Sequence, residues 1–305
     1  MTLIGSGSHT YEWVDGWAKT PSGVALGYTH GIVIDSLGRV IVHNQSKDAV
    51  AFFDREGDFL SSWGEEFAAG AHGLYLSVED GIEYLYLSDN ARHAVFKATL
   101  DGTILWERGA PDLPDVYASP DQYTPTDVAV SPDGRVFVGD GYGKPYVHIY
   151  TTSGDYIKSF GGPGSERGQL NSPHGVWVDT RRGAPRLLVA DRGNHRIQIF
   201  DLDGNSLELV TDEQNMPCCF FQHGDEIVIP DLFGRVTILD GDNKLVAHLG
   251  SNEGVWTWPG YPNISREKRV PGKFISPHAV TVDSNGDIYV AEWISDGRVT
   301  KLAKV

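Results

Sequence analysis

The sequence is poor in cysteine, with only Cys218 and Cys219 among 305 residues. Adjacent residues lie about 3.8 Å apart at Cα, whereas an ordinary disulfide joins Cα atoms about 5.5 Å apart. The pair therefore cannot form a disulfide scaffold. We expect two half-buried thiols on one strand, pointing to opposite faces, which suits a reducing compartment.

Long apolar runs are also missing. The first residues, MTLIGSGSH, contain no basic segment followed by an apolar one, so no signal peptide is seen, and nowhere do about 18 apolar residues follow one another. The chain as given predicts a soluble, cytoplasmic protein with no membrane partner. Secretion stays open if a leader was removed.

Positive charge is scarce: 25 Lys and Arg stand against 41 Asp and Glu, giving a net charge of -16. Basic residues cluster only in short stretches, at 181–182 and 266–269, which we interpret as solvated loops. An acidic chain without a basic surface is a poor partner for nucleic acid. We expect a monomer that takes a small-molecule or peptide substrate.

What the sequence does contain is a repeated strand pattern, clearest at residues 171–210. Four β-branched and aromatic runs, GVWVD, RLLVAD, RIQIFD and SLELV, are separated by Gly, Asp and Asn. Such runs bounded by turn residues indicate short strands. The stretch predicts a four-stranded antiparallel meander.

The same unit occurs six times, at intervals of roughly 40 to 60 residues. With His174 as the reference, the equivalent positions are His30, His72, Thr126, Cys218 and His278. Six four-stranded repeats predict an all-β fold, a six-bladed β-propeller that forms a single domain over residues 1–305.

The sixth repeat reaches Val305 after only three strands. Residues 11–17, YEWVDGW, resemble the fourth strands of other repeats and precede the first one. We therefore predict that the N-terminal strand pairs with the strand near 298–304 and closes the last blade. This pairing would remove an open sheet edge.

Three histidines suggest a metal site. His72, His174 and His278 begin the first strands of alternate blades, about 120° apart in a six-fold ring. Three imidazoles with an open fourth position are typical of catalytic zinc, so we predict zinc or another divalent ion, with His30 and Cys218 outside the ligand set. The alternative is that each histidine is a satisfied turn residue. A structural calcium ion in the channel is also considered.

Two further residues follow second strands on neighbouring blades. Tyr142, in Asp140-Gly141-Tyr142, could act as a base, and Arg192 offers the bidentate fork that a carboxylate requires. The aspartates at the ends of the second strands recur in most repeats, so we expect them to bond turn amides.

The long insertions 109–124 and 251–273 are rich in Pro and Gly. Because long loops often carry function, they could wall a pocket. Alternatively, their aromatic residues pack the insertions onto the body of the protein.

These segments carry a resemblance to a known family. The repeat resembles NHL six-bladed propellers, and AHGLYLS, TPTDVAVSPDGRVFVGDGY, SPHGVWVD, VADRGNHRIQIF and SPHAVTVDSNGDIYVAE resemble peptidyl-α-hydroxyglycine α-amidating lyases. The resemblance implies that His72, His174 and His278 hold zinc, that Tyr142 acts beside it and that Arg192 binds substrate. The sequence departs from the family where Ala279 replaces an aspartate, and it lacks the family's disulfides.

The resemblance implies a metal-dependent lyase that cleaves the C–N bond of an α-hydroxyglycine to an amide and glyoxylate. Two alternatives stay open. One is a metal-dependent lyase or hydrolase of another small α-hydroxy acid derivative. The other is a non-catalytic NHL propeller that binds a protein or glycan partner.

Overall fold

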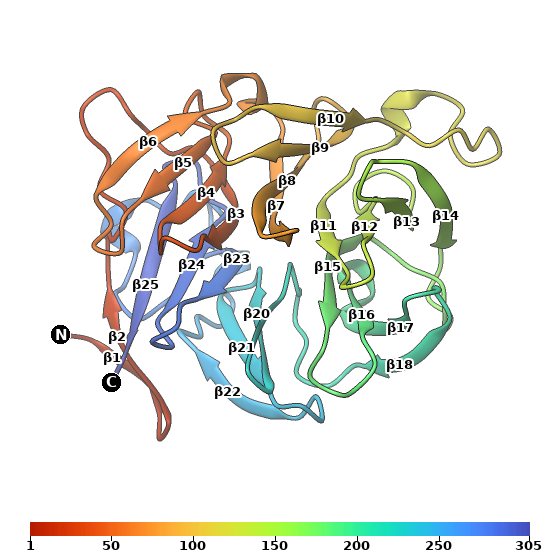
Figure 1. Ribbon diagram of the computed structural model, residues 1–305. Coiled ribbons are helices and arrows are strands. Elements are labelled where there is room, and N and C mark those ends of the chain that lie inside the picture. The colour runs from red at the N-terminus through yellow and green to blue at the C-terminus, as the bar shows by residue number, and fades with distance from the viewer. The chain divides into compact units, whose positions relative to one another are not determined.

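The computed structural model describes residues 1–305, and its strands form six antiparallel sheets (Figure 1). The sheets are the blades of a six-bladed β-propeller, which confirms the predicted fold class. The chain divides into two compact units: a central unit of residues 69–219 and a terminal unit of residues 1–68 with 220–305. Each unit is described by itself below.

The central unit contains three four-stranded sheets in simple meander order. Their strands are β7 (Ala71–Glu79), β8 (Ile82–Asp89), β9 (Ala94–Thr99) and β10 (Ile104–Arg108); β11 (Asp127–Val130), β12 (Arg135–Gly139), β13 (Tyr146–Thr151) and β14 (Tyr156–Gly161); β15 (Pro173–Asp179), β16 (Arg186–Asp191), β17 (Arg196–Asp201) and β18 (Ser206–Val210). The four strands predicted within 171–210 are confirmed.

The terminal unit contains the other three sheets. Their strands are β3 (Thr29–Ile34), β4 (Val40–Asn44), β5 (Val50–Phe53) and β6 (Phe59–Trp63); β19 (Phe221–His223), β20 (Glu226–Asp231), β21 (Arg235–Leu239) and β22 (Leu245–Leu249); β23 (Pro277–Val282), β24 (Ile288–Glu292) and β25 (Arg298–Lys304), extended by β2 (His9–Val14) and β1 (Leu3–Ser6).

The N-terminal strand closes the last blade, as predicted. Strand β2 pairs antiparallel with β25, with Tyr11 opposite Lys304 and Val14 opposite Lys301. Figure 1 shows the two termini close together where these strands meet. The strand ends at Val14, short of the predicted residue 17, because the chain turns at Gly16, which has a positive φ. Strand β1 was not predicted and adds a fifth strand next to β2.

The apolar core lies between the faces of neighbouring sheets. In the central unit, one cluster joins Phe137 of β12 to Val189 of β16 and Phe200 of β17, all fully buried. Inner strands are covered on both faces, and so β4 is buried at every position. The fourth strands lie at the sheet edges and are partly exposed, as in β6.

The helical content is limited to five three-residue 3₁₀ turns: η1 (Glu65–Phe67), η2 (Pro120–Gln122), η3 (Arg192–Asn194), η4 (Val255–Thr257) and η5 (Arg266–Lys268). None of these is long or apolar enough to cross a bilayer.

The aspartates that end second strands bond turn amides, as expected. Asp191 accepts the backbone N–H of Asn171 at 2.6 Å, and Asp89 accepts those of Ala91 and Arg92 at 2.9 and 2.8 Å. They fix the turns on which neighbouring side chains are presented.

The cysteine prediction was partly wrong. Neither thiol forms a disulfide, Cys218 being buried and Cys219 half-buried, but neither residue lies on a strand. Strand β19 begins only at Phe221, because the chain around Pro217 is irregular. Strand β19, the first strand of its blade, is therefore shorter than the repeat pattern indicated.

The closing strand generates a stability prediction. Trp13 of β2 is 5% exposed, and its ring centroid lies 4.6 Å from that of Phe274. We expect Trp13→Ala to lower the free energy of unfolding by about 3–5 kcal/mol, because it leaves a cavity in the closed blade. Denaturant unfolding measures the change. Leu3→Ala on β1, where Leu3 is 53% exposed, should change it by less than about 0.5 kcal/mol. Equal effects of the two substitutions would show that β2 does not hold the last blade.

Candidate functional site

The four first-strand histidines occupy the same local position. His30, His72, His174 and His278 are each the second residue of a strand, and the pairing register with the next strand is interrupted at each of them. Such bulges turn a side chain out of the regular alternation of a sheet. The sequence repeat placed these positions correctly at the start of the first strands.

Two of these histidines lie in the central unit, each held through its Nδ1. His72 Nδ1 is 2.7 Å from the carbonyl oxygen of Thr126, and His174 Nδ1 is 2.8 Å from that of Cys218. A carbonyl oxygen only accepts, so Nδ1 carries the proton in both rings. In its neutral form each imidazole then presents a lone pair at Nε2.

These hydrogen bonds can form because the backbone next to each histidine lies close to the carbonyl that accepts the bond. A Cβ added at Gly73 would lie 2.5 Å from the carbonyl oxygen of Thr126, and one at Gly175 would lie 2.3 Å from that of Cys218. Any larger residue would push the neighbouring chain away from the histidine. The glycine that follows each of these two histidines is thus required by packing.

The Nε2 atoms of both rings point at one phenol. The hydroxyl of Tyr142 lies 3.3 Å from His72 Nε2 and 3.0 Å from His174 Nε2, and the two imidazole centroids are 4.9 Å apart. Three residues from three different blades thus meet at one oxygen atom.

The segment that carries Tyr142 is fixed by Asp140. This buried carboxylate accepts the backbone N–H groups of Thr124 and Lys144 at 2.7 and 2.6 Å. It also accepts the hydroxyl of Tyr117 at 2.7 Å. Burial raises the pKa of Asp140 to about 6, although these hydrogen bonds act in the opposite direction.

Arg192 covers the other side of the phenol. It is the first residue of η3, is 8% exposed, and its guanidinium carbon lies 5.2 Å from the centre of the Tyr142 ring. Its Nη1 is 4.0 Å from the Sγ of Cys218. Burial disfavours the charge, but Tyr142 and Cys218 raise the pKa of Arg192 above its usual value, so that it stays cationic.

The phenol itself is partly shielded. Tyr142 is 44% exposed as a residue, yet its hydroxyl is surrounded by His72, His174 and Arg192. Burial is the largest influence and raises the pKa of Tyr142 above 10, while Arg192 acts to lower it. The side chains alone therefore keep this tyrosine protonated at neutral pH.

His278 lies in the terminal unit. Its Nδ1 is 2.9 Å from the carbonyl oxygen of His30, and the two rings lie edge to face with centroids 4.6 Å apart. His72 and His174 make the same hydrogen bond. In each case the Nδ1 of a histidine on a first strand donates to the backbone carbonyl at the equivalent position of the next repeat. The structure thus brings together His72, His174, Tyr142 and Arg192, and it gives His278 the same orientation within its own unit.

The chemistry of this donor set fits a divalent metal. Nitrogen lone pairs at Nε2, with Nδ1 protons held by backbone carbonyls, are what zinc-binding histidines present. His72 and His174 would hold such an ion together with His278; the three-histidine set stays a prediction. The sequence could not predict that the Thr126 and Cys218 carbonyls accept these hydrogen bonds, because every residue has a backbone carbonyl and the residue type does not show which one is used.

The long insertions pack onto the body, which favours the second of the two interpretations. In 109–124, Tyr117 and Tyr123 are buried, and Tyr117 supports Asp140. In 251–273, the Tyr261 hydroxyl lies 2.9 Å from the Leu232 carbonyl oxygen and 3.0 Å from Ser276 Oγ. Trp256 stacks on Phe233 with centroids 4.8 Å apart.

Comparison with known proteins agrees with the resemblance inferred from the sequence. The NHL repeat model matches residues 170–200. Human NHL repeat-containing protein 3 is 28% identical over 91% of this chain and 80% of its own length. Drosophila melanogaster peptidyl-alpha-hydroxyglycine alpha-amidating lyase 1 is 26% identical over 93% of this chain and 58% of its own length.

Among solved structures, virginiamycin B lyase from Staphylococcus aureus is similar with a TM-score of 0.62. It covers 97% of this chain and 100% of its own, at 13% identity, so it supports the fold alone. Relatives and structural neighbours thus include enzymes.

The site predicts metal binding through the histidines. After incubation with zinc and removal of excess metal, His174→Ala should retain far less zinc than the wild type, because one nitrogen ligand is lost. Elemental analysis measures the metal per chain. The matched control is His223→Ala, since His223 is exposed at the end of β19. Unchanged zinc content in His174→Ala would contradict the assignment.

Proposed function

We propose that the protein is a metal-dependent lyase that cleaves the C–N bond of an α-hydroxyglycine, giving an amide and glyoxylate. The observation that carries the proposal is the position of the Tyr142 hydroxyl between the Nε2 atoms of His72 and His174, with Arg192 over the same ring. The resemblance to an amidating lyase over 93% of the chain supports it.

A zinc ion held by His72, His174 and His278 would supply positive charge that lowers the pKa of nearby hydroxyl groups and polarises substrate oxygens. That charge acts against the burial that raises the pKa of Tyr142. The phenol needs such help, because the only cationic side chain that lowers its pKa is Arg192.

In the proposed reaction, Tyr142 carries the proton. The phenolate accepts the proton of the substrate's α-hydroxyl, and the electrons of that O–H bond form the aldehyde C=O of glyoxylate. The C–N bond breaks with its electron pair on nitrogen, and Tyr142 returns the proton there to give the amide. No atom is gained or lost, so no water and no oxidant are needed.

Arg192 is proposed to bind the carboxylate of the substrate. A guanidinium offers two parallel N–H donors to a carboxylate, and Arg192 stays charged although it is 8% exposed. Its place over the Tyr142 ring would set the α-carbon next to the phenol oxygen. Orientation of this kind accounts for much of enzymatic rate enhancement.

The second candidate is a lyase or hydrolase for another small α-hydroxy acid derivative. Ala279 favours it, because this position follows His278 directly and carries an aspartate in the amidating lyases. Ala279 is buried and pairs with Ala291. A site without that carboxylate would take the same α-hydroxy acid core with different substituents.

We expect Tyr142→Phe to lower kcat on an N-acyl-α-hydroxyglycine by about 10² to 10⁴, because it removes the proton carrier and no metal ligand. Arg192→Ala should mainly raise KM, since a charge-assisted contact of about 1.5–3 kcal/mol is lost in ground and transition states alike. Glyoxylate release measures both constants, and zinc content should stay at the wild-type level.

The matched control is Tyr156→Phe, because Tyr156 lies on β14 and its exposed hydroxyl bonds only Ser159. It should keep wild-type kinetics. A zinc-loaded wild type that releases no glyoxylate would refute the amidating reaction. Turnover of a different α-hydroxy acid derivative would then support the second candidate.

A further inference from the structure

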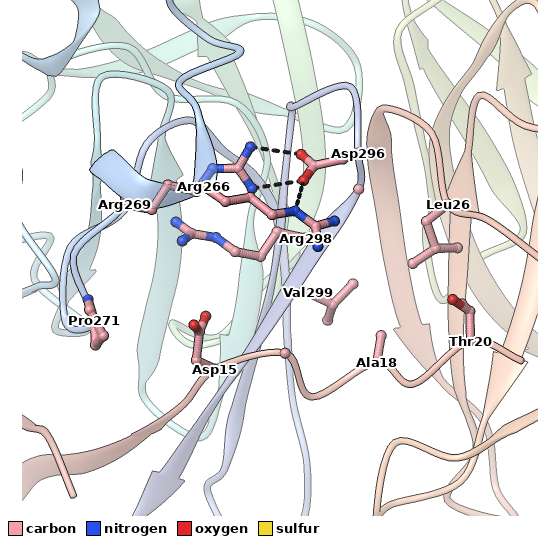
Figure 2. Close-up of a pocket in the computed structure, with 12 residues that line it drawn as sticks. Asp15, Ala18, Thr20, Leu26, Arg266, Arg269, Pro271, Asp296, Arg298 and Val299 are labelled. Atoms are coloured by element: carbon pink, nitrogen blue, oxygen red, sulfur yellow. Dashed lines mark hydrogen bonds and ion pairs between the residues drawn. The ribbon is translucent and has the colours of Figure 1, made fainter.

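The terminal unit contains a cavity that belongs to no histidine site. It measures about 360 Å³ and is lined by the segment after β2, the 251–273 insertion and the turn into β25. Its polar lining residues are Asp15, Thr20, Arg266, Arg269, Asp296 and Arg298, and its apolar wall consists of Ala18, Leu26, Pro271 and Val299 (Figure 2). Pockets that hold small molecules usually measure about 300–1,000 Å³, so this one suits a small ligand.

Two arginines share one carboxylate at the cavity. Asp296 accepts hydrogen bonds from Arg266 Nε at 2.6 Å and from Arg269 Nη1 and Nη2 at 3.0 and 2.8 Å, as Figure 2 shows. Although burial opposes ionisation, these two guanidiniums lower the pKa of Asp296 to about 2. Two positive charges therefore face one negative charge, and one positive charge remains uncompensated within this group.

The third arginine is buried. Arg298 is 9% exposed; its Nε bonds Glu292, and its Nη2 reaches the carbonyl oxygen of Lys273 at 3.4 Å. Neither bond occupies Nη1. Figure 2 shows the Asp15 carboxylate pointing toward this guanidinium from across the cavity, and Asp15 contributes to holding Arg298 charged.

The charges around the cavity select the ligand. Including Glu292 behind the wall, three arginines face three carboxylates, so the site is neutral and a multiply charged anion would be repelled by Asp15 and Asp296. Yet Arg266 uses only Nε on Asp296, which leaves N–H donors on Arg266 and Arg298 for one planar acceptor. A carboxylate matches a guanidinium edge, and the apolar wall matches a hydrocarbon body.

We propose that this cavity binds a small organic acid that has a single carboxylate and an apolar body. The carboxylate lies against Arg266 and Arg298, and the apolar part lies against Leu26 and Val299. The site is separate from Arg192, the carboxylate-binding residue of the proposed reaction, which belongs to the central unit.

Calorimetric titration with benzoate tests the proposal, with benzamide as the uncharged analogue. The wild type should bind benzoate saturably and benzamide at least about 10-fold more weakly, because a charge-assisted contact is lost. Arg266→Gln should weaken benzoate binding by at least about 10-fold for the same reason. Arg266 is mostly exposed, so this change should not disturb folding.

Lys268→Gln is the matched control, because Lys268 lies in the same 3₁₀ turn, is exposed and does not line the cavity. It should bind benzoate like the wild type. Arg298→Lys, which keeps the charge beside Glu292 but loses the planar fork, should weaken binding as Arg266→Gln does.

Three outcomes would overturn the proposal. The first is that the wild type binds no benzoate. The second is equal loss of binding in Arg266→Gln and Lys268→Gln, which would indicate general surface charge. The third is loss of benzoate binding in Arg192→Ala with full binding in Arg266→Gln, which would place the ligand in the central unit. None of these results bears on glyoxylate release.

Discussion

The arrangement of the site depends on hydrogen bonds from side chains at the start of one first strand to backbone carbonyls of a neighbouring blade. His72 donates to Thr126, and Thr126 Oγ1 donates in turn to the carbonyl of Pro173 at 3.2 Å. In the terminal unit His278 donates to His30, and Thr29 Oγ1 donates to the Glu292 carbonyl at 2.6 Å. Buried donors that are satisfied in this way fix the spacing of adjacent sheets.

The same hydrogen bonds decide what the histidines can do. With Nδ1 committed to a carbonyl, each imidazole has one tautomer and one ring orientation, and its Nε2 is available as a ligand or acceptor. In the central unit the two Nε2 atoms converge on Tyr142, while Asp140 and Tyr117 hold the tyrosine's own loop. The hydrogen bonds that join neighbouring blades thus also orient the side chains of the site.

Much of the fold could be predicted from the sequence because repetition reinforces weak strand signals. The pattern around His174 recurs, so the number of blades and the missing fourth strand of the last one could be counted. The extra strand β1 could not, since Leu3–Ser6 is a short edge strand with no repeat equivalent. The irregular chain before β19 was also missed, because Cys218 was assigned to the start of a first strand, whereas that strand begins at Phe221.

Within the central unit, the sequence predicted that Tyr142 and Arg192 lie beside His72 and His174, but not the protonation of these side chains. Tyr142 and Arg192 were recognised by position after second strands, and both lie at the His72–His174 pair. The raised pKa of Tyr142 follows from enclosure by residues distant in the chain, which only the fold reveals. The basic stretch 266–269 was interpreted from sequence as a solvated loop. The cavity beside it could not be predicted, because Asp296 and Arg298 approach it from another segment.

X-ray absorption at the zinc edge, on protein purified without added metal, tests the central claim most directly. We predict about one zinc per chain with a first shell of imidazole nitrogen at about 2.0–2.1 Å. A sulfur shell at about 2.3 Å would instead assign the metal to cysteine, and absence of bound zinc even after loading would contradict the histidine site altogether.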